Sequence, residues 1–79
     1  MINFFAHSKD KKDSGMEFYF AMVESFAGDL IQNFRTQDIY NIEGIQVRVN
    51  QKGQIAFSEK NNELISMIEN KTGYKLKCR

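Results

Sequence analysis

The chain has 79 residues and a formal net charge of +1 at pH 7, with 42% hydrophobic and 27% charged residues. This length excludes two independent cores, so we expect one domain spanning residues 1–79. The composition excludes a disordered chain, and a net charge so close to zero favours no class of partner.

A short apolar run, INFFAH, predicts a strand over residues 2–7. Its alternate residues divide between two faces, with Ile2, Phe4 and Ala6 on one and Phe5 and His7 on the other. The polar linker KDKKDSG follows. Ser14 precedes Glu17 by three residues, the spacing of a capping box, so a helix is expected to begin here.

From Gly15 to Arg35 the hydrophobic period is helical, and most apolar residues fall on one stripe: Met16, Tyr19, Phe20, Val23, Phe26, Ala27, Leu30, Ile31 and Phe34. Phe18 and Met22 are spaced (i, i+4) but lie outside this stripe, so we expect them to be exposed. An exposed Phe–Met pair is typical of a surface that binds another protein or a second copy of the chain. The alternative is that the second helix or a loop covers the pair.

A β-hairpin is predicted next, with Ile45, Val47 and Val49 alternating on one strand and Ile55 and Phe57 on the other. Gly53 in the NQKG turn suits a left-handed backbone conformation. A second helix carries Leu64, Ile65, Met67 and Ile68, with Ser58, Asn61 or Asn62 as its N-cap and Gly73 as its C-terminal glycine. The closing segment GYKLKCR predicts the last strand.

These elements give the order βαββαβ. We therefore predict an α+β, ferredoxin-like domain with two helices on one face of a four-stranded antiparallel sheet. If residues 2–7 do not form a strand, the order becomes αββαβ.

Charge is segregated along the chain. Residues 13–43 contain six acidic residues and one cation, whereas residues 60–79 contain five cations and two acidic residues. If Tyr74, Leu76 and Cys78 pack under the helices, the cations of the last strand point out of the open sheet face. Arg48 and Phe5 would join them there, and Lys52 would contribute from the turn, so the predicted site is Phe5, Arg48, Lys52, Lys75, Lys77 and Arg79.

Two functions fit this layout. In the first, the cations contact phosphates and Phe5 stacks on an unpaired base, so the ligand is single-stranded or looped RNA. In the second, the protein is a small regulator or inhibitor that binds another protein, or itself as a homodimer, through Phe18 and Met22. Lysines on an edge strand also protect against aggregation, which is an alternative explanation of Lys75 and Lys77.

The segment from Lys52 to Phe57 lies where RNA-recognition domains carry their main RNA-contacting motif. Lys52 and Gly53 match that motif, but Gln54 and Ala56 stand where it has aromatic rings. Base stacking by those rings is therefore missing, and mainly phosphate contacts are expected. We do not infer membership of that family.

The sequence indicates no catalytic residue, no metal site and no cofactor. His7 is the only histidine, and no cluster of potential ligands accompanies it. Cys78 is the only cysteine, so it forms no internal disulfide, and we expect it to be a small buried residue in a reducing compartment. The chain shows no secretory signal and no membrane-spanning stretch, so we expect a cytoplasmic protein. Its Ile, Lys and Asn content is typical of an AT-rich bacterial or phage genome.

Overall fold

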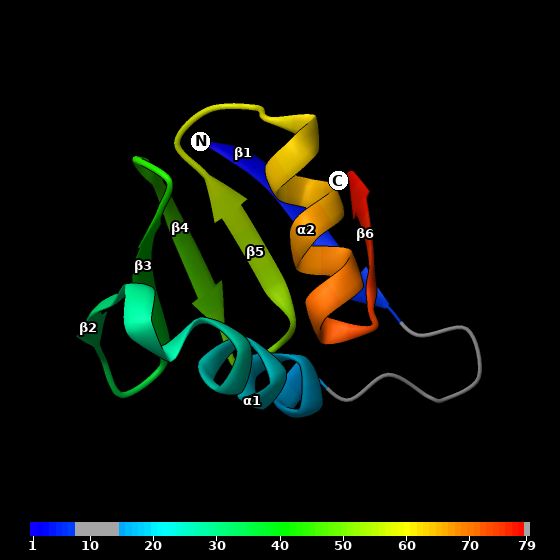
Figure 1. The fold of residues 1–79 in the computed structure, drawn as a ribbon. Helices are drawn as coiled ribbons and strands as arrows, with labels where there is room; N and C mark the ends of the chain where they lie inside the picture. The colour runs from blue at the N-terminus through cyan, green and yellow to red at the C-terminus, as the bar shows by residue number, and fades with distance from the viewer. Residues whose placement is uncertain (8–14, 79) are drawn as a thin grey trace.

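The structure is a computed structural model that describes residues 1–7 and 15–78. Within these residues, six strands form one antiparallel sheet in the order β2-β3-β4-β5-β1-β6. The strands are β1 Ile2–His7, β2 Leu30–Asn33, β3 Gln37–Ile42, β4 Ile45–Asn50, β5 Gln54–Phe57 and β6 Lys75–Cys78. The helices are α1 Gly15–Phe26 and α2 Asn62–Thr72, with a 3₁₀ turn at Ala27–Asp29. Both helices lie on the same face of the sheet (Figure 1).

The fold class is α+β, but the four-stranded ferredoxin-like prediction is wrong. The four predicted strands are present as β1, β4, β5 and β6, and they are neighbours in the sheet. Two further strands, β2 and β3, lie between α1 and β4 in sequence and extend the sheet to six strands. The αββαβ alternative is wrong as well, because residues 2–7 do form a strand.

The first helix is shorter than predicted. It ends at Phe26 and not at Arg35. Gly28 and Asp29, which favour helices poorly, lie in the 3₁₀ turn that follows, and Leu30 already has an extended backbone with ψ of 122°. Residues 30–33 then gain hydrogen bonds to β3, including the pairs Leu30–Tyr40 and Asn33–Asp38. Tertiary pairing therefore overrides a helical spacing of apolar residues.

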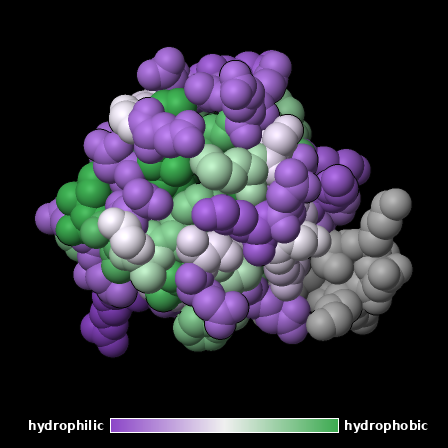
Figure 2. All heavy atoms as spheres, in the orientation of Figure 1, coloured by the Kyte–Doolittle hydropathy of each residue, from purple (hydrophilic) through white to green (hydrophobic). Residues whose placement is uncertain are grey.

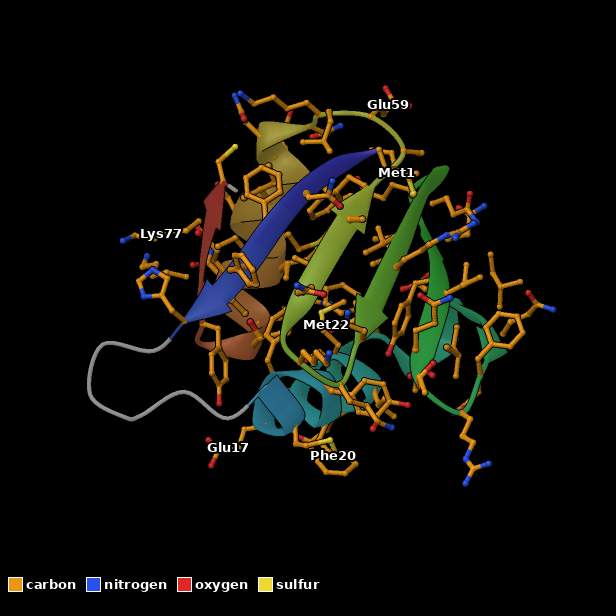
Figure 3. The ribbon with its side chains drawn as sticks, turned by 180° about the vertical axis from the view of Figure 1, so that it is seen from behind. Met1, Glu17, Phe20, Met22, Glu59 and Lys77 are labelled. Atoms are coloured by element: carbon orange, nitrogen blue, oxygen red, sulfur yellow. The ribbon has the colours of Figure 1, made fainter. Side chains whose placement is uncertain are left out.

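The buried face of α1 also differs from the predicted stripe. Its buried side chains are Phe18, Tyr19, Met22 and Phe26. The expectation that Phe18 and Met22 are exposed is wrong, since both have no exposed surface. Phe20, placed in the predicted stripe, is 59% exposed, and Figure 3 shows it directed away from the sheet while Met22 lies behind the strands. The predicted stripe included Leu30, Ile31 and Phe34, none of which belongs to the helix. Including them gave the stripe a wrong direction on the helix surface.

Both tight turns of the central hairpins use left-handed backbone positions. Glu43 and Gly44 connect β3 to β4 with φ of 53° and 82°, the pattern of a two-residue hairpin turn. The Gly44 backbone N–H also donates to the Asn41 side chain at 3.0 Å. In the next turn Gly53 has φ of 83°, as the sequence predicts, and its N–H donates to the Asn50 carbonyl at 3.3 Å.

The second helix is capped at both ends. Asn61, one of the three predicted N-caps, accepts a hydrogen bond from the Leu64 backbone N–H at 3.0 Å. Gly73 ends the helix in the left-handed conformation, and its N–H donates to the Glu69 carbonyl at 2.9 Å. The predicted capping residue Ser14 lies outside the described residues.

The core lies between the sheet and the helices, and it contains one fully buried carboxylate. Asp38 of β3 accepts hydrogen bonds from the Tyr19 hydroxyl at 3.0 Å and from the Tyr40 hydroxyl at 3.3 Å. Each carboxylate oxygen thus has a donor, which offsets the cost of removing the group from water. Tyr19 comes from α1, so this network connects the helix to the sheet.

Replacing Phe18 should test the packing of α1. We expect Phe18→Ala to lower the free energy of unfolding by about 3–5 kcal/mol, because it leaves a cavity in a filled core. The matched variant Phe20→Ala should change it by about 1 kcal/mol or less, because Phe20 is largely exposed and loses chiefly its edge-to-face contact with the Tyr19 ring. Urea denaturation measures both values. A small effect at Phe18 would contradict the observed orientation of the helix.

The tyrosine network predicts alkaline sensitivity. Burial raises the pKa of Tyr40 and Tyr19 above the usual 10.0, and the carboxylate of Asp38 raises both further. The folded chain therefore holds these phenol protons more tightly than the unfolded chain. Their contribution to stability is complete below pH 10.0 and is lost as the pH rises through the raised values.

Urea midpoints measured between neutral pH and strongly alkaline pH should accordingly be flat at first and then fall. The variant Tyr40→Phe removes one of the two groups, so its midpoint should fall less steeply. If phenol absorbance shows Tyr19 and Tyr40 ionising with ordinary pKa values, the network is not intact in solution.

Candidate nucleic-acid interface

The sheet face opposite the helices is open, and it is the view drawn in Figure 3. The register places side chains from five strands in one row across this face. Phe5 pairs with Lys77 of β6 on one side and with Gln54 of β5 on the other. Farther along, the Asn50 side chain contacts Gln54, and Asn50 pairs with Gln37 of β3. We call Lys77, Phe5, Gln54, Asn50 and Gln37 the cross-strand row.

A second line of residues runs parallel to this row. Asn3 pairs with Ala56, and Ala56 pairs with Arg48. On the other side of the cross-strand row, at the edge of the sheet, Lys75 lies opposite His7. None of the residues that the described strands direct to this face is acidic. The charged side chains that these strands place on the face, Arg48, Lys75 and Lys77, are therefore all cations.

The structure places four of the predicted site residues on one face, but it brings only Lys75 and Lys77 next to Phe5, and Arg48 lies two strands away from β1. Phe5, Lys75, Lys77 and Arg48 all lie on the open face, as the alternation of their strands predicts. Phe5 is 38% exposed, and Lys77 extends outward from β6 in Figure 3. Lys52 lies in the β4–β5 turn, at the end of this face where Gln54 begins β5. Arg79 lies outside the described residues.

Sequence reasoning missed the three amides of the cross-strand row. Asn50 organises them: its Oδ1 accepts from the backbone N–H groups of Lys52 at 2.9 Å and Gln54 at 3.1 Å. Its Nδ2 donates to Gln54 Oε1 at 2.7 Å. These contacts hold the Gln54 amide in one orientation. The signal present in the sequence is the repeated occurrence of Asn and Gln at outward positions of the hairpin, and uncharged amides do not alter the charge pattern.

Two hollows meet at the amides. One, of about 240 Å³, opens on the sheet beside Arg48 and Asn3. The other, of about 620 Å³, lies between Lys52, Thr36 and the start of α1. Gln37, Asn50 and Gln54 line both hollows, with Arg48 at the smaller one and Lys52 at the larger one.

The described residues give no support for a metal site or a membrane-spanning helix, and they place Cys78 at the surface. No group of three or more His, Cys, Asp or Glu side chains in residues 1–7 and 15–78 is placed to hold a metal ion. Cys78 is exposed near the end of β6, so the expectation that it is buried is wrong; the strand lies at the sheet edge and leaves one flank uncovered. Neither described helix is long and apolar enough to cross a membrane.

The helix side carries exposed apolar residues. Phe20 is 59% exposed and Met16, one turn before it on α1, is 38% exposed. Ile31 of β2 is 56% exposed, and Figure 2 shows apolar surface at the edge of the molecule where β2 lies, as well as smaller apolar areas over the middle of the view. These residues, and not Phe18 and Met22, form the exposed flank of the first helix and its surroundings.

Comparison of the chain with protein-family models, with curated proteins and with solved structures returned no match. Function must therefore be inferred from the geometry of the surfaces described above.

Proposed function

We propose that this protein is a non-catalytic binding protein that holds single-stranded or looped RNA on its open sheet face. The observation that carries the proposal is the position of Phe5 opposite Lys77 and close to Lys75, on a face to which the described strands direct no acidic side chain. Arg48 lies on the same face, two strands away from β1. The cations would contact phosphates, and the exposed ring would stack on an unpaired base. A protein acting in this way would work in the cytoplasm, in line with its single cysteine.

The shape of the face favours single strands over duplexes. A sheet cannot enter the deep, narrow major groove of A-form RNA, whereas unpaired bases can turn outward and stack on an aromatic side chain. The cross-strand row offers one ring and several amides side by side, and neighbouring strands are about 4.8 Å apart. The number of cations is small, so we expect modest affinity and a correspondingly shallow dependence on salt.

A salt titration with single-stranded RNA tests the proposal. Contacts from Arg48, Lys52, Lys75 and Lys77 to about four phosphates should give a slope of log affinity against log salt near −2.8. The double variant Lys75→Gln, Lys77→Gln should bind more weakly, with a slope near −1.4, because two phosphate contacts are lost. Its thermal midpoint should be unchanged, since both side chains are exposed.

The matched control is Lys60→Gln with Lys71→Gln, which removes the same charge away from the open face: Lys60 precedes α2, and Lys71 lies over the Phe26 ring at 5.0 Å. It should retain the wild-type slope. Equal weakening by both double variants would show that only overall charge matters. Absence of wild-type binding to RNA at low salt would reject the proposal.

A second candidate function is self-association through the exposed flank of α1. Phe20 and Met16 are spaced (i, i+4), so they are neighbours on one helix face. Apolar side chains this exposed on so small a domain favour an interface, because a second copy would add buried surface to a core of limited size.

Sedimentation equilibrium over a wide concentration range tests this second candidate. The wild-type protein should dimerise at high concentration, and Phe20→Ser should remain monomeric because it removes the largest exposed apolar group of the helix. Phe5→Ser, on the opposite sheet face, is the control and should dimerise like the wild type. A monomeric wild-type protein throughout the range would exclude self-association by this surface.

A further inference from the structure

We propose that Gln54 reads the edge of the base that stacks on Phe5, and that it selects a carbonyl oxygen over an amino group at position 4 of a pyrimidine. The preferred ligand is then uracil-rich single-stranded RNA. This inference rests on the proposed function and names the ligand class of the same face.

The position of Gln54 follows from the register of the sheet. Phe5 of β1 and Gln54 of β5 are direct cross-strand partners. Directly opposite residues on one face have Cβ atoms about 4.5–5.5 Å apart, so the side chains of Gln54 and Phe5 leave the sheet next to each other. A base stacked on Phe5 would therefore bring its polar edge within hydrogen-bonding reach of Gln54, while Lys77 lies on the other side of the ring for a phosphate.

The orientation of Gln54 follows from its hydrogen bonds. Asn50 is fixed by two backbone donors of the β4–β5 turn, Lys52 and Gln54. It donates in turn to Gln54 Oε1 at 2.7 Å. The Gln54 carbonyl is thereby engaged, and its NH₂ group has no hydrogen-bond acceptor among the described residues. Gln54 meets a ligand as a donor, and Asn50 is the residue that positions it.

A donor at this point distinguishes bases that are otherwise alike. Uracil carries the O4 carbonyl, an acceptor, where cytosine carries the N4 amino group, a donor. The two rings have nearly the same size, so stacking on Phe5 discriminates little between them. Because two donors facing each other cannot form a hydrogen bond, Gln54 should favour uracil, and the unpaired base presents this edge freely.

Binding of oligouridylate and oligocytidylate of equal length tests the inference. The wild-type protein should prefer oligouridylate by about fivefold, the factor that one ordinary net hydrogen bond provides. In Gln54→Ala this ratio should fall to about one. In Gln54→Glu it should invert, because a carboxylate accepts from the cytosine N4 amino group and offers no donor to O4.

The salt slope of Gln54→Ala should equal that of the wild type, since no phosphate contact is removed. The control Gln46→Ala removes an amide of β4 that pairs with Asn41, outside the cross-strand row, and should keep the wild-type preference. Equal binding of the two polymers by the wild type, or a uracil preference that persists in Gln54→Glu, would overturn the inference while leaving RNA binding intact. Failure of the wild type to bind either polymer would instead overturn the proposed function itself.

Discussion

The arrangement of this protein depends on β1, which is paired on both sides and buried on one face. It forms hydrogen bonds with β5 and with β6, and its Phe4 and Ala6 side chains enter the core. Phe4 meets Phe57 edge to face, with ring centroids 5.5 Å apart. A shift of one residue would bury Phe5 and expose Phe4, so the packing of the core fixes the register. The same constraint places Phe5 beside Lys77 and Gln54 on the opposite face, and the candidate site is therefore a consequence of the core.

The parts of the fold that the sequence predicts are those in which a local pattern has one interpretation. Alternation over residues 45–50 and 54–57 is compatible with a strand and not with a helix, and Gly53 and Gly73 occupy left-handed positions that other residues adopt at a cost. Residues 30–34 are different. Their apolar spacing fits a helix, and only pairing with β3 makes them a strand, which is information that no local window contains.

Strand β3 is not predicted from the sequence for a related reason. Its core-facing positions are Asp38, Tyr40 and Ile42, and an aspartate breaks the alternation of apolar and polar residues that marks a half-buried strand. Asp38 is tolerated in the core because Tyr19, nineteen residues earlier in the chain, donates to it. The candidate site likewise has features that follow from local sequence and features that depend on strand pairing. The outward direction of its cations follows from strand phase alone, whereas the position of Phe5 opposite Gln54 requires knowledge that β1 pairs with β5.

The open face also shows why its cations are not equivalent. Ile39 points to this face and yet is only 7% exposed, and its cross-strand partners are Arg48 and Gln32. Long side chains at such positions cover apolar surface with their aliphatic stems. Arg48 is therefore suited to packing over Ile39 as well as to carrying charge. Lys75 and Lys77 lie on the edge strand β6, where charge also discourages pairing with another chain. Edge protection needs a cation at any outward position, but it does not need an aromatic ring opposite. Edge protection therefore does not account for the placement of Phe5 against Lys77, which is the feature that the proposed RNA binding would use.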